Sequence, residues 1–164
     1  MKHYLLKITV ILCAFLIFSC SEDSSDSETE ITTEETSSEQ SIEEEILRLV
    51  NEHRQSKGLS PLENNEIAHE IAVEHTNYMI SINEINHDNF DDRFQQLREE
   101  VKAVLAGENV ASGHPTPRAV VDGWLNSQGH RENIERDFTH SGIAAIKNEG
   151  GRYYYTQLFY RKQK

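Results

Sequence analysis

The stretch AGENVASGHPTPRAVVDGWLNSQGHRENI, residues 106–134, decides how this chain is interpreted. Polar groups recur in it among apolar residues that we expect to be buried, and Glu108 and His130 each follow a glycine directly. A hydrophobic core has no need of a carboxylate or an imidazole at these positions, whereas a ligand pocket does. These two residues, together with His87 upstream, are therefore the first candidates for a functional site.

Helices are predicted before this stretch and at its centre. Ser41 and Glu44 form a capping-box pattern at the start of an amphipathic segment that should end at Gly58. Asn65 can cap a second helix. The apolar stripe of that helix consists of Ile67, Ile71, His75, Tyr78 and Ile82. His75 on this stripe is interpreted as a buried core histidine.

A third helix is expected to open at Asp91 or Asp92. Its apolar positions are Phe94, Leu97, Val101, Val104 and Leu105. A fourth helix runs from about Pro117 to Trp124, and Trp124 is expected to pack in the core.

Strands are predicted at the C-terminal end of the chain. Gly142–Ile146 and Tyr153–Tyr160 flank the sequence Asn-Glu-Gly-Gly, which is typical of a hairpin turn. Helices come first and the hairpin last, so the order predicts an α+β fold in which the helices cover a small antiparallel sheet.

The N-terminal segment, residues 1–19, has the features of a lipoprotein signal peptide. Lys2 and Lys7 precede an apolar run of signal-peptide length, and Ser19-Cys20 resembles the site at which a cysteine is acylated. Both cysteines of the chain lie at or before Cys20. The rest of the chain therefore has no thiol for a disulfide or a thiolate zinc site.

The composition of the segment after Cys20 indicates an extended linker, or stalk, between a lipid anchor and a globular domain. Residues 21–45 contain 11 acidic side chains and no Lys or Arg, whereas residues 46–164 carry 17 acidic and 14 basic side chains. We expect residues 20–40 to be a lipidated cysteine and a disordered acidic linker, and residues 41–164 to be one globular domain. A nearly neutral domain on an acidic stalk offers no electrostatic case for nucleic-acid binding.

Two enzymatic motifs are excluded by the spacing of the residues. His69-Glu70 begins like a zinc-protease helix, but that motif needs a second histidine at Val73. The chain has no Gly-x-Ser-x-Gly elbow, and the domain has no cysteine nucleophile.

Several short motifs occur together in an order that resembles a known family. They are Asn51-Glu52-His53-Arg54, Gly58-Leu59-Ser60-Pro61-Leu62, His87-Asp88, Gly107-Glu108-Asn109-Val110, the segment from Trp124 to Ile134, and Tyr155-Thr156-Gln157. This order is similar to that of the CAP superfamily, or SCP domains, which comprises cysteine-rich secretory proteins, antigen 5 and pathogenesis-related proteins. The resemblance covers the chain from about Ser41 to Tyr160.

The resemblance implies an α-β-α sandwich with a central cleft lined by histidines and glutamates, which bind a divalent metal in some members. Carried over by motif, His87 is the first cleft histidine, Glu108 the cleft glutamate and His130 a second histidine. Asn109 is expected to hold loop backbone around the cleft, and His140 is a further candidate for it.

Two departures from the family pattern bear on the metal. Many eukaryotic members have a second glutamate three residues after the tryptophan, where this chain has Ser127, and they carry disulfides that this chain lacks. His87, Glu108 and His130 are still a reasonable ligand set for zinc, with one coordination position left for water. The same three side chains can instead form a hydrogen-bonded network without metal.

The sequence thus favours an exported, monomeric CAP domain, anchored to the outer membrane or cell surface by the lipid on Cys20. Its expected role is a binding or interaction module of the cell envelope for a small-molecule, lipid or protein ligand. The alternative is a metal-dependent hydrolase that uses the same cleft, with Ser127 or a water molecule as the nucleophile. A structural surface domain with a vestigial cleft is a third interpretation.

Overall fold

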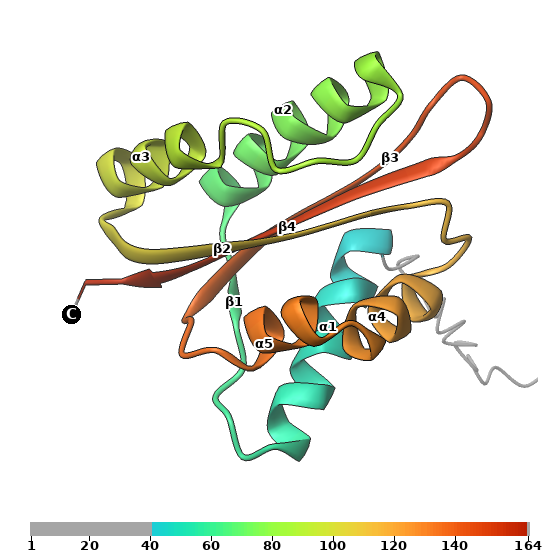
Figure 1. The fold of residues 1–164 in the computed structure, drawn as a ribbon. Helices are drawn as coiled ribbons and strands as arrows, with labels where there is room; N and C mark the ends of the chain where they lie inside the picture. The colour runs from blue at the N-terminus through green and yellow to red at the C-terminus, as the bar shows by residue number, and fades with distance from the viewer. Residues whose placement is uncertain (1–40, 164) are drawn as a thin grey trace, which may run out of the picture. The chain divides into compact units, whose positions relative to one another are not determined.

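The computed structural model describes residues 41–163 (Figure 1). The predicted signal peptide, the lipidation site Cys20 and the acidic linker lie outside the described residues. The helices are α1 (Ile42–Ser56), α2 (Glu66–Ile82), α3 (Phe90–Val101), α4 (Pro117–Asn126) and α5 (Gln128–Glu135). The strands are β1 (Glu63–Asn64), β2 (Ala103–Ser112), β3 (His140–Lys147) and β4 (Tyr153–Lys162).

The four strands form one sheet in the order β1-β3-β4-β2. β3 and β4 make the predicted antiparallel hairpin, β2 pairs antiparallel with β4, and the short β1 pairs parallel with β3. β2 therefore forms one edge of the sheet, although it precedes the hairpin in the chain.

The helices cover the two faces of this sheet, as Figure 1 shows. α2 and α3 pack on one face, while α1, α4 and α5 pack on the other. At Gly142 the backbone of α2 lies directly on β3, because a Cβ atom there would lie 2.1 Å from backbone atoms of Ala68 and His69. The arrangement confirms the predicted α+β class and the α-β-α sandwich.

Clusters of apolar side chains pack between the helices and each face of the sheet. The larger cluster joins α1, α4 and α5 to the sheet around Trp124, Phe138 and Phe159, and a second joins α2 and α3 to it around Ile71, Leu97 and other residues. The burial of Trp124 is as predicted.

The N-termini of the first two helices are also as predicted, whereas α1 ends at Ser56, just before Gly58. Ser41 and Glu44 form the capping box of α1, and the side chain of Asn65 caps α2. The buried face of α2 is rotated from the predicted stripe, however, since Tyr78 and Ile82 are exposed. Thr76 and Met79 are buried in their place, so the face of α2 that packs on the sheet includes these two residues.

The prediction for the third helix was wrong at its C-terminal end. α3 ends at Val101, and Val104 and Leu105 belong to β2. Lys102 adopts a left-handed conformation with φ of 61°, which stops the helix and turns the chain into the strand. Val101, Val104 and Leu105 are spaced as in one helix, but the first lies in α3 and the other two in β2.

No helix in residues 41–163 is long and apolar enough to cross a membrane.

Candidate functional site

The candidate site is built around Glu108, which lies in the middle of β2 and points toward α2 and α3. Its side chain is 2% exposed. Arg93 of α3 donates two hydrogen bonds to it, from Nε to Oε2 at 2.7 Å and from Nη2 to Oε1 at 2.8 Å. His87 donates a third from Nδ1 to Oε1 at 2.7 Å. The structure thus brings two of the predicted cleft residues, His87 and Glu108, into direct contact.

A second imidazole stands beside this carboxylate. His75 of α2 is buried, and its Nε2 donates to the carbonyl of Asn86 at 2.9 Å while lying 3.7 Å from Oε1 of Glu108. Burial lowers the pKa of His75, against the opposing effect of the Glu108 charge. His75 is a satisfied core histidine, as predicted, and it also helps to enclose the site.

The charge of Glu108 is stabilised although the group is buried. Burial alone opposes ionisation, but the hydrogen bonds from His87 and Arg93 and the positive charge of Arg93 outweigh it, so the pKa of Glu108 lies below its usual value. Glu108 is therefore an ion-paired carboxylate, with its negative charge compensated by Arg93.

Two asparagines join β2 to α5. Asn133 donates from Nδ2 to the carbonyl of Glu108 and to Oδ1 of Asn109, both at 3.0 Å. Asn109 in turn donates to the carbonyl of His130 at 3.1 Å. Both asparagines thus hold the backbone around the site, which is the role expected for Asn109.

His130 lies on α5, and its side chain is partly buried. Burial lowers the pKa of His130, and the nearby charge of His87 lowers it further. The two predicted cleft histidines are therefore electrostatic neighbours, although only His87 touches Glu108.

A pocket of about 310 Å³ opens beside Glu108. It is lined by His87, Phe90, Ala106, Gly107, Glu108, Asn133 and Arg136. Its walls come from the start of α3, the edge strand β2 and the end of α5. His87 stands at the mouth, since 52% of its side chain is exposed.

Only His87 and Glu108 of the predicted cleft residues line this pocket, whereas His130, Asn109, Ser127 and His140 do not. Ser127 lies at the junction of α4 and α5, where its side chain makes no capping hydrogen bond. His140 lies on β3, stacks on Tyr160 with ring centroids 4.8 Å apart, and approaches Glu63 to 3.5 Å. β4 separates β3 from β2, so His140 is not brought to Glu108.

The expected zinc ligands do not fit a three-ligand site in this arrangement. Both oxygens of Glu108 accept from Arg93, and a guanidinium in contact with a ligand carboxylate opposes a divalent cation. Within residues 41–163, no group of three or more His, Cys, Asp and Glu side chains is arranged to hold a metal. Zinc binding by His87, Glu108 and His130 stays a prediction that requires Arg93 to leave Glu108.

Sequence reasoning missed Arg93, Phe90 and Arg136. Arg93 is an arginine in a helix rich in charged residues, and no spacing rule marks it as the partner of Glu108. Arg136 and Phe90 become pocket residues only because β2 lies between α3 and α5, and β2 itself was not predicted as a strand.

Comparison with known proteins agrees with this architecture. Residues 47–159 match the family model described as the cysteine-rich secretory protein family, CAP. The chain is 33% identical over 125 residues to YkwD of Bacillus subtilis, which covers 74% of this chain and 49% of that protein. It is 34% identical over 126 residues to the Bacillus subtilis membrane protein YlbC, covering 73% and 34%. This chain thus spans half or less of the length of these two relatives.

Solved structures show the same fold. An extracellular protein containing an SCP domain from Bacillus anthracis superposes with a TM-score of 0.66 at 34% identity, covering 74% of this chain and 40% of that one. An outer surface protein from Borrelia burgdorferi superposes with a TM-score of 0.65 at 24% identity, covering 72% and 90%. From the matched residues, the motif order and the α-β-α sandwich, the chain belongs to the cysteine-rich secretory protein, or CAP, family.

Proposed function

We propose that this protein is an exported lipoprotein, anchored through Cys20, whose CAP domain binds a ligand of the cell envelope in the pocket beside Glu108. Export is supported by the signal-peptide pattern of residues 1–19 and by the extracellular and outer-surface proteins among its structural neighbours. The ligand is a small molecule, a lipid-like molecule or a segment of another protein.

The observation that carries this proposal is the state of Glu108. A carboxylate that is buried, ionised and bonded by both Arg93 and His87 is preorganised and already paired. A general base needs a carboxylate that can accept a proton from its substrate at working pH, and a lowered pKa makes that less favourable. The arrangement therefore suits recognition better than turnover.

A hydrolase mechanism through the same cleft would need more than this site offers. Its metal would need Glu108 free of Arg93. Among the hydrogen bonds of residues 41–163, the side chain of Ser127 makes none to His75, His87 or His130. We therefore assign no catalytic step to these residues.

Nuclear magnetic resonance of the domain tests the binding role without knowledge of the ligand. A fragment of residues 41–164 contains every helix, strand and apolar cluster that the structure describes. A detergent extract of the envelope of the producing cells should shift the amide signals of the pocket residues. His87→Ala, a change at an exposed side chain, should weaken that shift, while Arg118→Ala on the outside of α4 should not. Equal shifts in all three proteins, or none at the pocket, would contradict the proposal.

A further inference from the structure

Side chains protect the edge of the sheet at β3, where the short β1 leaves it uncovered. β1 pairs with β3 only as far as Ser141. Beyond it, Nδ1 of His69 donates to the carbonyl of Ile143 at 2.6 Å, and Glu43 accepts from the backbone N–H of Ala145 at 3.3 Å. Side chains of α2 and α1 thus take the place of a missing strand, as expected for an edge that must not pair with other chains.

The opposite edge, β2, is protected in the same way at two of its carbonyls. Nε1 of Trp124 donates to the carbonyl of Val110 at 3.3 Å, and Asn133 donates to the carbonyl of Glu108 at 3.0 Å. Both carbonyls therefore face away from β4. The N–H of Gly113 bonds to the carbonyl of Tyr153 on the β4 side, which agrees with this alternation.

Ala106 is the next residue that faces away from β4. In an antiparallel strand the N–H and C=O of one residue point to the same side, and the side alternates from residue to residue. No hydrogen bond reaches the outward N–H or C=O of Ala106, or the outward N–H of Glu108, from any side chain in residues 41–163. Val104 is skipped in the register between Ala103 and Leu105, so the open edge is short.

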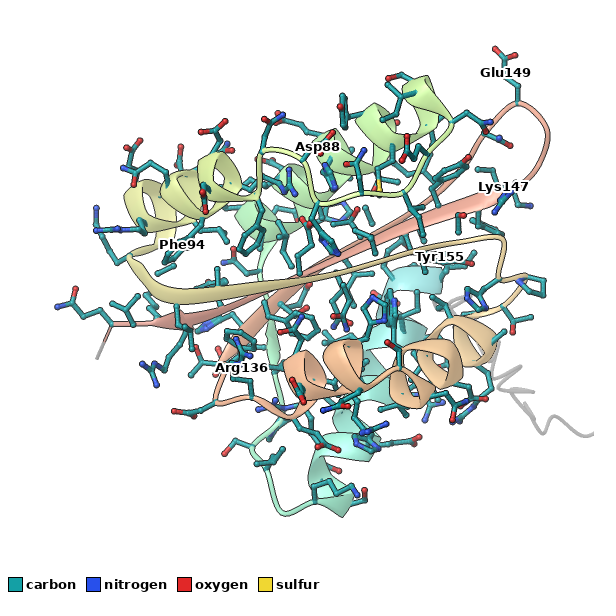
Figure 2. All side chains as sticks on the ribbon, in the orientation of Figure 1. Asp88, Phe94, Arg136, Lys147, Glu149 and Tyr155 are labelled. Atoms are coloured by element: carbon teal, nitrogen blue, oxygen red, sulfur yellow. The ribbon has the colours of Figure 1, made fainter. Side chains whose placement is uncertain are left out.

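This open edge forms the floor of the pocket. Ala106, Gly107 and Glu108 all line it, between the start of α3 and the end of α5. In Figure 2, β2 runs between Asp88 and Phe94 on the side of α2 and α3 and Arg136 on the side of α5. A fifth strand laid against Ala106 would therefore enter between the two helical layers.

The two walls of the pocket favour different side chains. Residues paired across strands share a face of the sheet. A side chain level with Ala106 or Glu108 would project toward Phe90 and His87, because Glu108 itself points to that face. A side chain level with Gly107 would project toward Arg136 and Asn133, since a Cβ at Gly107 would lie 3.1 Å from Oδ1 of Asn133.

Arg136 is the charge that the pocket leaves unpaired. The acidic residues before and after it in the sequence pair with other side chains: Glu135 bonds to His53 at 2.8 Å, and Asp137 bonds to Arg161 at 3.0 Å. Arg136 has no carboxylate partner in residues 41–163 and lies over the ring of Phe138 at 5.9 Å. Glu108 does not offset the positive charge of Arg136, because the negative charge of Glu108 is already compensated by Arg93.

We propose that the open edge of β2 binds an extended segment of a partner polypeptide by strand addition, with an acidic side chain of that segment meeting Arg136. The main chain of the segment bonds to both backbone groups of Ala106 and to the N–H of Glu108, and an apolar residue on each side of the acid packs toward Phe90. This inference rests on the proposed binding function and specifies its ligand class.

The test uses the 41–164 fragment and three capped pentapeptides. The first is Thr-Val-Glu-Val-Thr, the second has Lys in place of Glu, and the third carries N-methyl groups on both valines. Amide signals are followed during titration, and each protein variant is first shown to keep the signal dispersion of a folded domain.

The Glu peptide should shift the amide signals of Ala106 and Glu108 saturably and slow the hydrogen exchange of both amides. The Lys and N-methyl peptides should bind about tenfold more weakly or worse, since each loses a charge pair or main-chain hydrogen bonds. Arg136→Glu should reverse the preference so that the Lys peptide binds better, whereas Arg118→Glu, an equal charge change on α4, should leave it unchanged.

Three results would overturn the inference: equal binding of the Glu and Lys peptides, a preference that Arg136→Glu does not alter, or no shift at Ala106 and Glu108 with millimolar peptide. If the envelope extract still shifts pocket signals in that last case, the binding function stands and its ligand is not an extended peptide. If neither the extract nor the peptides act on the pocket, both proposals fail.

Discussion

Arg93 and Glu108 form a two-pronged ion pair, with N–O distances of 2.7 and 2.8 Å, that ties α3 to the middle of β2. Both side chains are nearly inaccessible to solvent. The pair therefore serves two purposes: it joins two elements of the domain, and it fixes the carboxylate on which the pocket is built.

Arg93→Ala should lower the free energy of unfolding by about 3 kcal/mol, because it leaves the buried charge of Glu108 without its main partner. Urea denaturation of the 41–164 fragment measures this. Arg98→Ala, at an exposed arginine of the same helix, is the control and should change stability little. The double variant Arg93→Met/Glu108→Gln should recover much of the loss. A loss below about 0.5 kcal/mol in Arg93→Ala would show that the pair is not buried in solution.

Zinc should bind the wild-type fragment weakly, because Arg93 occupies the carboxylate that the metal needs. In Arg93→Met the same carboxylate is free, and zinc should then supply the missing positive charge and raise the melting temperature. Calorimetric titration and thermal melts with and without zinc measure both effects, and His87→Ala/His130→Ala in the Arg93→Met background is the control. Tight zinc binding by the wild type, lost in His87→Ala/His130→Ala, would show that Arg93 moves aside and would revive the hydrolase alternative.

Stability should fall as the pH drops below about 6.5, the usual pKa of histidine. His75 is buried and its folded-state pKa is lowered, so the unfolded chain binds more protons in this range, and the stability that neutral His75 contributes is lost as pH falls toward the folded pKa. His75→Gln keeps a donor for the carbonyl of Asn86 but does not titrate. Thermal melts on either side of about pH 6.5 should show a shallower slope for His75→Gln than for the wild type. Identical slopes would exclude His75 as a source of the pH dependence of stability.

Gly107 is required by the close packing of the α5 end against β2. A Cβ atom there would lie 2.9 Å from Cζ of Phe138, so Gly107→Ala should cost about 1 to 3 kcal/mol. Gly129 on α5 has open space around it, and Gly129→Ala is the matched control. Denaturation of both variants checks the difference. Equal stabilities would mean that Phe138 moves away without cost.

Cys20→Ala should move the full-length protein from the membrane fraction to the soluble fraction, because acylation of this cysteine is the proposed anchor. Fractionation of the producing cells, with Cys13→Ala as the control, measures it. Persistence of the Cys20→Ala protein in the membrane fraction would refute the lipid anchor.

The sequence predicted the outer parts of this fold better than its centre. Capping residues such as Ser41 and Asn65 act locally, and the hairpin of β3 and β4 is indicated by its turn, so these elements follow from short stretches of chain. β2 gave no such signal. It is covered by helices on both faces and carries Glu108 and Asn109 inward, so it lacks the alternation of apolar and polar residues that marks a half-buried strand.

The candidate site was predicted in the same uneven way. The motif order identified Glu108 and His87, which the fold places 2.7 Å apart. Arg93 and Arg136 stand in helices or at their ends with no distinguishing pattern, and their relation to Glu108 depends on how α3 and α5 pack against β2. Contacts between elements far apart in the chain are set by tertiary packing, which spacing rules do not describe.

The central claim is that the pocket beside Glu108 contacts a ligand at the cell envelope, and a photoreactive crosslink tests it most directly. A photoreactive phenylalanine analogue replaces Phe90, which lines the pocket, or Gln95, an exposed residue of the same helix. Irradiation of living cells should give a discrete adduct from position 90, none from position 95, and a weaker adduct when Arg136→Glu is added. Adducts of equal yield from both positions, or none from position 90, would contradict the account.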